Sequence, residues 1–253
     1  MASGAWSQSR DSVQPTTLSA AQIVEQMQRH NQLRNQELKH YKSVRLYAVE
    51  YKGFSKTITA KMEVEVEYEA ALGKSFRIVS QSGSNFLCEK VLKRAVDSEK
   101  AAAEDKGSSA LTAANYRFRL LGSESLEGRP AYILDVEPLT ASKFLYRGKV
   151  WVDEADFALA RIEAEPAKNP SFWISRTLIR HRNAKMGDFW LPKENRSETK
   201  VRIGGTAVLT IDYGTYQVAP EGTGRSVGLA SKPYFAAPKQ QCGDGLTLLT
   251  GCR

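Results

Sequence analysis

Alternation of apolar and polar residues with a period of two runs through most of this sequence after residue 43, and it limits the fold more than any other feature. In residues 143–166, "KFLYRGKVWVDEADFALARIEAEP", two alternating runs flank a polar turn, as in a hairpin of two antiparallel strands. Residues 56–70 form a longer run, with apolar residues on one face and glutamates on the other. Short turns such as Gly187-Asp188 separate successive runs, which favours a meander over crossover units.

Two stretches have helical periodicity instead. Ser19 and Gln22 form a capping box, and the helix predicted over residues 19–39 has one apolar face. A second helix is predicted to begin near Ser84. A long, twisted antiparallel sheet curls on itself. The predicted fold is therefore mainly β (α+β), a half-open antiparallel β-barrel of about 11 strands with two helices covering its concave face.

Composition divides the chain into three parts. Residues 1–17 are predicted to be a flexible leader, residues 18–218 a single domain, and residues 219–253 an irregular C-terminal tail. Hydrophobic residues make up 42% and charged residues 25% of the chain, as in a globular protein. Basic residues exceed acidic ones by 36 to 28, but they form no long run, and no nucleic-acid partner is expected. No apolar run reaches the roughly 18 residues that a transmembrane helix needs.

Residues that could bind a metal are present but scattered. The three histidines lack a cysteine or second histidine at ligand spacing, so no metal site is predicted. The glutamates at 63, 65, 67 and 69 share one strand face, about 7 Å apart. A calcium site needs oxygens that converge from a bent loop. The glutamates are therefore predicted to form a solvated outer face, paired with cross-strand lysines and arginines.

No catalytic motif is recognisable either. The chain has no Gly-x-Ser-x-Gly elbow and no phosphate-loop lysine, and "GTGRSVG" at 222–228 lacks the third glycine of a dinucleotide loop. A hydrolase would need only two carboxylates across a cleft, and sequence spacing singles out no such pair. We predict no catalytic residues and no cofactor. The carboxylates considered for such a pair are Asp135, Glu137, Asp153 and Asp212.

The order of elements resembles the LolA/LolB superfamily of periplasmic lipoprotein carriers and receptors, and more closely the bacterial outer-membrane lipoprotein-sorting proteins. The resemblance covers most of residues 43–218, in "FRIVSQSGSNFLCEKVLKR", "ANYRFRLLG", "FLYRGKVWVDEADFALARIEAEPAKNPSFW", "GDFWLPKENRSET" and "GGTAVLTIDYGTY". It implies a cavity for lipoprotein acyl chains. The functional arginine of the carriers matches no one arginine here. Leu72 could stand where the receptors expose a loop leucine, although a turn leucine tucked under the sheet is the favoured interpretation.

The predicted function is therefore that of a non-enzymatic carrier or receptor, periplasmic or outer-membrane associated and bacterial, with its signal peptide removed. It would bind acyl chains of a lipoprotein or lipid as a monomer, and exchange them with an inner-membrane exporter or an outer-membrane acceptor. The alternative is an envelope sensor or scaffold that uses the same fold to recognise a lipoprotein or protein partner. A continuous apolar tunnel would favour the carrier, and a barrel filled by side chains the scaffold.

The first helix is expected to lie across the mouth of the barrel as a lid, because its apolar face needs a surface to cover. Alternation alone does not decide whether Trp151 or its two valine neighbours face the interior. The residues expected to line the cavity are Met27 and Leu33 from the lid, and Met62, Val64, Val66, Tyr68, Phe144, Tyr146, Trp151 and Trp173 from the strands.

The three cysteines bear on localisation. Cys242 and Cys252 bracket a short, glycine-flanked loop near the chain end, and Cys88 stands alone on the second helix. In an oxidising compartment Cys242 and Cys252 are expected to form a disulfide, with Cys88 reduced and packed as a small apolar residue. The alternative is three thiols in a cytosolic protein.

Overall fold

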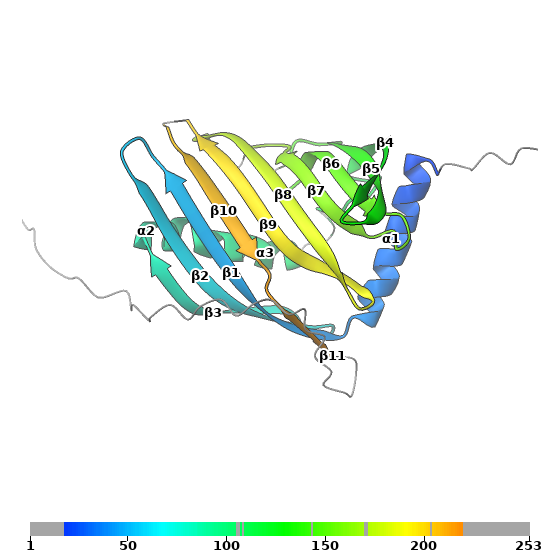
Figure 1. Cartoon of the computed structure of the whole chain (residues 1–253), viewed down its shortest axis with the longest axis horizontal. Coiled ribbons are helices and arrows are strands. Elements are labelled where there is room, and N and C mark those ends of the chain that lie inside the picture. Colours follow the sequence, from blue (N-terminus) through cyan, green and yellow to red (C-terminus); the bar gives the residue numbers. More distant parts are fainter. Residues whose placement is uncertain are drawn as a thin grey trace, which may run out of the picture.

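The computed structural model describes residues 18–219 except 105–106, 108, 143, 170–171 and 203. Eleven antiparallel strands form one open sheet, in the order β3-β2-β1-β10-β9-β8-β7-β6-β5-β4, with β11 also paired to β1 (Figure 1). The strands are β1 (His40–Lys52), β2 (Thr57–Glu69), β3 (Gly73–Gly83), β4 (Tyr116–Leu126), β5 (Arg129–Pro138), β6 (Tyr146–Asp153), β7 (Leu159–Pro166), β8 (Ile174–Met186), β9 (Phe189–Val201), β10 (Thr206–Asp212) and β11 (Tyr216–Ala219).

Two helical segments accompany this sheet. The first is α1 (Ala20–Glu37), and the second joins α2 (Asn85–Leu87), the π-helical turn η1 (Cys88–Leu92) and α3 (Lys93–Glu104) into one run, which we call the lid segment. The lid segment follows β3, the outermost strand on one side of the sheet. The chain then re-enters the sheet with β4, the outermost strand on the other side. The predicted half-open, mainly β architecture with two helices is thus confirmed. None of the described helices is both long and apolar enough to cross a membrane.

Helix α1 begins where the sequence predicts. The Ser19 backbone N–H donates to Gln22 Oε1 at 2.9 Å, and the Gln22 N–H donates to Ser19 Oγ at 3.3 Å, which completes the capping box. Near the other end of the helix, the Arg34 guanidinium donates to the carbonyl oxygens of Asp156 and Phe157 in the β6–β7 turn, at 2.7 and 3.3 Å. These bonds fix α1 to the β6–β7 end of the sheet.

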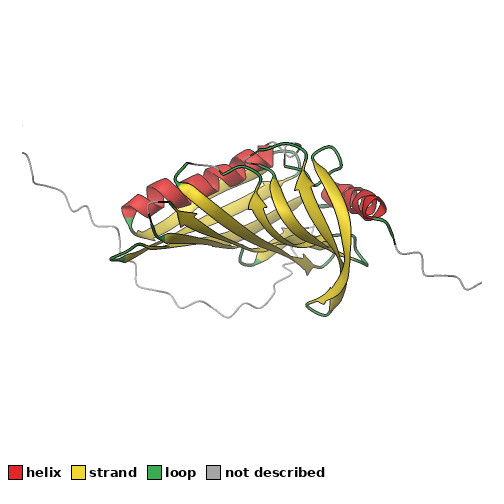
Figure 2. Ribbon diagram, turned by 90° about the horizontal axis from the view of Figure 1, so that it is seen from above, coloured by secondary structure: helices red, strands yellow, loops and turns green. Residues whose placement is uncertain are grey.

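Both helical segments cover the same face of the sheet (Figure 2). Directly paired residues on neighbouring strands point to the same side of a sheet. A row of such residues can therefore be followed along the inner face through seven neighbouring strand pairs. The row is apolar at its two ends and polar in the middle, where β8 and β9 contribute His181 and Asn195. The row reads Met62, Tyr47, Ile211, Asn195, His181, Ile162, Val150 and Leu134.

The polar middle divides the interior into two apolar clusters. The α1 cluster packs Ile23, Val24 and Met27 against β4–β7. The α3 cluster packs the lid segment, through residues such as Leu92 and Val96, against β1, β2 and β9–β11. Helix α1 therefore covers one half of the inner face, and the lid segment covers the other.

Candidate functional site

Four alternate residues of β1 point into the α3 cluster and form an unusual polar row on an apolar face. The row is Tyr41, Ser43, Arg45 and Tyr47, and their partners on β2 are Tyr68, Val66, Val64 and Met62. Among the described residues Arg45 is the largest of the fully buried side chains, with 1% of its surface exposed. A buried guanidinium is costly unless it is paired, so its surroundings are the natural place to look for a function.

Arg45 is held by the lid segment. Its Nη1 forms an ion pair with the Glu99 carboxylate of α3, and the Tyr47 hydroxyl donates to Glu99 Oε1 at 2.9 Å. The guanidinium carbon lies 4.7 Å from the ring centre of Tyr213 and 5.6 Å from that of Phe76, within the range of cation–π contacts. The ion pair between Arg45 and Glu99 therefore connects β1 to α3.

Burial and charge set the protonation of this group. Burial is the largest single effect and would lower the pKa of Arg45, but the Glu99 carboxylate and the surrounding tyrosines together outweigh it and the pKa rises. Burial raises the pKa of Tyr41 to about 12, and burial also raises the pKa values of Tyr47 and Tyr216. The arginine is therefore a permanent cation, and the tyrosines are neutral hydrogen-bond donors.

Three buried polar atoms in this cluster have no hydrogen-bond partner among the described residues: Arg45 Nε, Ser43 Oγ and the Tyr216 hydroxyl. Ser43 and Tyr216 are directly paired across β1 and β11, and Ser43 and Arg45 are alternate residues of β1. An unpartnered buried polar group costs about 1–3 kcal/mol, so such groups are rare without a reason. Their gathering at one place marks this place as a candidate ligand site, which we call the buried arginine site.

Apolar walls surround the buried arginine site. Met62, Val64 and Val66 form its floor and are fully buried, and Leu92 and Val96 of the lid segment cover it. The floor residues and the covering residues pack together in the α3 cluster. The site is therefore closed by the lid segment in this structure.

A hollow of 410 Å³ lies beside the site, between the end of α3 and the start of β3. Its lining includes Phe76, whose ring also contacts the Arg45 guanidinium. Lys74 and Lys100 lie at the same hollow. This hollow therefore connects the surface to the side chain that flanks Arg45.

The structure separates the residues predicted to line a cavity. Met62, Val64 and Val66 lie in the α3 cluster with Tyr68 packed against it, whereas Met27 and Tyr146 belong to the α1 cluster. Three others do not face the interior, since Leu33, Phe144 and Trp173 are each about half exposed. Leu72 is 83% exposed, so the interpretation that it is tucked under the sheet is wrong.

Trp151 is buried but lies on the outer face of the sheet. It is paired with Arg161, whose guanidinium lies 4.8 Å from the ring centre, and its Nε1–H donates to Glu124 at 2.5 Å. Val150 and Val152 are the neighbours that face inward, in the α1 cluster. The inclusion of Trp151 among the cavity residues is therefore wrong, because a large aromatic residue need not be on the core side when a cation covers it.

A second hollow, of 660 Å³, is lined by residues of β5–β9 and is strongly charged. Arg129 pairs with the buried Asp153 at 2.6 and 2.8 Å. Lys185 and the Trp190 Nε1–H both donate to the Asp156 carboxylate, at 2.8 and 3.0 Å. These contacts hold the strand ends together.

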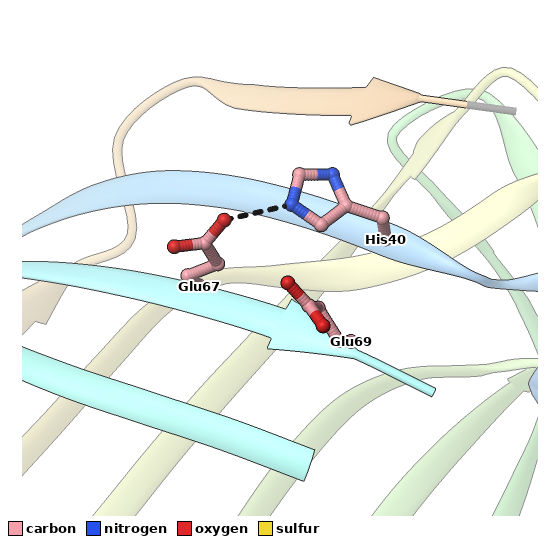
Figure 3. A group of neighbouring side chains, drawn as sticks. All are labelled: His40, Glu67 and Glu69. Atoms are coloured by element: carbon pink, nitrogen blue, oxygen red, sulfur yellow. Dashed lines mark hydrogen bonds and ion pairs between the residues drawn. The ribbon is translucent and has the colours of Figure 1, made fainter. Parts of the chain in front are cut away.

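One group of side chains could hold a metal ion by position. His40 Nε2 lies 3.0 Å from Glu67 Oε1, and Glu69 lies beside them, with possible ligand atoms within 4.8 Å of one another (Figure 3). The Lys42 ammonium also lies 2.8 Å from Glu67 Oε1, and this contact and the His40 contact lower the Glu67 pKa. A divalent cation would have to displace Lys42. The ion pairs Glu67–Lys42 and Glu65–Arg77 confirm the predicted cross-strand partners of the glutamate row.

The carboxylates considered for hydrolysis are each engaged locally. Arg119 donates to Asp135 at 2.8 Å, Arg147 lies 3.2 Å from Glu137, and the Asp212 carboxylate accepts from the Gly214 N–H at 2.8 Å. Cys88 is buried in the α3 cluster, as expected of a small apolar residue. Cys242 and Cys252 lie outside the described residues.

Sequence reasoning missed the buried arginine site. The signal was present in "YKSVRLY" (41–47), where the residues with the parity of Tyr41 and Tyr47 include Ser43 and Arg45. A serine and an arginine on the buried parity of a central strand are a departure from simple alternation. Glu99 had no comparable signal, because it stands in a helical stretch with several charges.

No protein-family model and no curated protein matches the chain. Similar solved structures include a DUF1329 family protein from Desulfovibrio piger, 13% identical over 82% of this chain and 95% of that one, with a TM-score of 0.43. A LolA superfamily protein from Nitrosomonas europaea is 12% identical over 80% and 94% of the two chains, with a TM-score of 0.32.

A third structure is a domain assigned to the outer membrane lipoprotein-sorting proteins, from Vibrio parahaemolyticus. It is 12% identical over 79% of this chain and 93% of that one, with a TM-score of 0.37. These solved structures are what the chain is similar to, and the resemblance to the LolA/LolB superfamily stays a prediction.

Proposed function

We propose that this chain is a non-enzymatic, periplasmic protein that binds an acyl chain of a lipoprotein or lipid between the lid segment and strands β1 and β2. The observation that carries the proposal is the set of three unpartnered polar atoms, Arg45 Nε, Ser43 Oγ and the Tyr216 hydroxyl, above an apolar floor. All three can donate a hydrogen bond, and none has an acceptor among the described residues. A ligand that fits must therefore combine an acceptor oxygen with an apolar body.

The polar end of an acyl chain has this composition. An ester carbonyl or carboxylate oxygen accepts from a guanidinium and from hydroxyls, and charge-assisted bonds of this kind are the stronger ones. The methylenes would lie on Met62, Val64 and Val66, and each buried methylene contributes about 0.8 kcal/mol. The floor supplies affinity without specificity for chain length, whereas the polar atoms fix which end of the chain lies at Arg45.

Entry requires the lid segment to move, because the site is filled and covered in this structure. The hollow beside Phe76 gives the ligand head a first position next to Arg45, between Lys74 and Lys100. A carboxylate or ester oxygen that reaches Arg45 competes with Glu99 for the guanidinium. Binding is then coupled to release of α3, since Glu99 is its charged link to the floor.

The test is titration of delipidated protein with a fluorescent long-chain fatty acid, using variants that remove one hydroxyl each. Tyr216→Phe removes a hydroxyl without a described partner, so folding stability should be unchanged or higher while affinity falls about 2- to 12-fold, the value of one hydrogen bond. Tyr116→Phe is the matched control in the α1 cluster, where the hydroxyl accepts from the Tyr146 N–H at 3.3 Å. It should leave affinity unchanged. Equal affinity for wild type and Tyr216→Phe would place the ligand elsewhere.

The second candidate is an envelope sensor or scaffold that recognises a lipoprotein or a protein partner. The filled state of both apolar clusters favours it, because neither described hollow is an apolar tunnel. The same titration separates the two functions. A delipidated protein that binds no fatty-acid probe would exclude the carrier and leave the scaffold.

A further inference from the structure

The strands of the half-barrel end along two opposite sides of the sheet, and these two sides, called edges from here on, differ in chemistry. In an antiparallel sheet, successive strand connections fall alternately on opposite edges. Connections 53–56, 139–145, 167–173 and 202–205 share one edge, which carries the β1–β2 and β9–β10 turns at the top of Figure 1, and we call this edge the aromatic rim. The opposite edge carries the connections 70–72, 127–128, 154–158 and 187–188.

Exposed aromatic side chains gather on the aromatic rim. Phe54 is 92% and Phe172 75% exposed, and Trp173 and Phe144 are about half exposed. In the described connections of the opposite edge, the one large apolar side chain that is exposed is Leu72. Singly exposed apolar residues are ordinary, but exposed aromatics in three connections of one edge are not.

Three of these connections touch one another. The Phe54 ring lies against Gly204, where a Cβ would come within 2.0 Å of it, and Gly204 has a φ of +108°. The Arg202 N–H donates to the Trp173 carbonyl oxygen at 2.8 Å, and the Arg202 guanidinium lies 5.1 Å from the ring centre of Phe172. The β1–β2, β7–β8 and β9–β10 connections therefore form one continuous surface of aromatic rings around an arginine.

Charge divides in the same way. The described residues of the four aromatic-rim connections include three basic residues (Lys56, Lys168 and Arg202) and no acidic one. The four connections of the opposite edge contain four acidic residues, of which Glu127 is ion-paired with Arg182 and Asp156 with Lys185 and Arg129. The basic residues of the aromatic rim therefore favour contact with an anionic surface over a neutral one.

We propose that the aromatic rim docks this protein on the surface of an anionic phospholipid bilayer. Phenylalanine and tryptophan next to lysine and arginine are the residues that suit the headgroup region, where rings meet acyl chains and cations meet phosphates. Each cation near an anionic leaflet contributes about fivefold in affinity. The rings lie at the tips of separate turns. A protein partner is usually anchored by a side chain buried in a pocket, so this arrangement suits the fluid surface of a bilayer better.

The experiment measures co-sedimentation of delipidated full-length protein with vesicles of phosphatidylcholine and phosphatidylglycerol in equal parts. We expect binding that weakens with added salt and is at least about fivefold weaker with phosphatidylcholine alone. Phe54→Ser should reduce binding severalfold. Leu72→Ser is the matched control, an equally exposed apolar residue on the opposite edge, and should bind like wild type.

Fluorescence quenching by brominated lipids locates the contact. Quenching should be lost in Trp173→Phe and kept in Trp151→Phe, whose tryptophan is buried on the outer face. Equal binding by Phe54→Ser and wild type, or quenching that survives in Trp173→Phe, would overturn the proposal. Self-association in solution that Phe54→Ser abolishes, without vesicle binding by wild type, would also overturn it and assign the rim to a second copy. None of these readouts depends on a ligand at Arg45.

Discussion

Replacing Glu99 with glutamine removes the negative charge that neutralises the buried Arg45 and leaves the shape of the side chain nearly unchanged. Removing one partner of a buried ion pair costs about 3–5 kcal/mol, because the other charge stays desolvated. Glu99 retains 22% side-chain exposure, so some water can reach the pair, and we expect the lower end, about 3 kcal/mol. For a domain of this size the melting temperature should fall by about 6–12 °C.

The reverse change should cost less. Arg45→Met removes the buried cation and leaves Glu99, which can turn toward solvent, so we expect a loss of about 1 kcal/mol. The double variant Arg45→Met/Glu99→Gln should then be about as stable as Arg45→Met alone, with a coupling energy of about 2–3 kcal/mol. Urea denaturation followed by tryptophan fluorescence measures all four proteins.

The two single variants distinguish an uncompensated buried charge from a loss of packing. If Glu99→Gln lowers the unfolding free energy by less than about 0.5 kcal/mol, Arg45 is solvated and the site is not closed by α3. If both single variants lose the same free energy, the pair acts through packing and not through an uncompensated charge.

Three further predictions concern other parts of the molecule. Met27→Ala should lower the unfolding free energy by about 2–5 kcal/mol without changing fatty-acid affinity, because Met27 is buried in the α1 cluster and not at the buried arginine site. Burial lowers the pKa of His181 from 6.5, so the unfolded chain takes up the proton first as pH falls. Stability should therefore decrease below about pH 6.5, and the decrease should be smaller in His181→Gln when melting temperature is followed against pH. Thiol titration of the denatured chain should find one reactive thiol if Cys242 and Cys252 pair in the periplasm, whereas three would exclude that pair.

The sequence predicts the architecture of this protein better than its site. Period-two alternation and short polar turns determine the strand neighbours, and the capping box at Ser19 and Gln22 determines where α1 begins. Register is the harder step. Whether Trp151 or Val150 faces inward depends on strand pairing, because Val150 lies beside the buried Ile162 and Leu134, whereas Trp151 lies beside Arg161.

The site depends on contacts between residues far apart in the chain. Arg45 and Glu99 meet because the lid segment returns over β1, and Tyr216 joins them because β11 pairs with β1. Neither contact leaves a local signal. The polar middle of the inner face was equally hidden, because β8 and β9 alternate like the other strands but place His181 and Asn195 inward.

Photo-crosslinking shows which part of the protein contacts a bound acyl chain. A fatty acid with a photoactivatable group near its carboxylate, bound to delipidated protein and mapped by peptide mass spectrometry, should label residues around Arg45 on β1 and the facing part of α3. A second fatty acid with the group at the tail should label β2 around Val64. Labels confined to the α1 cluster or to the outer face, or no labelling above an unbound control, would contradict the proposal that an acyl chain lies between the lid segment and strands β1 and β2.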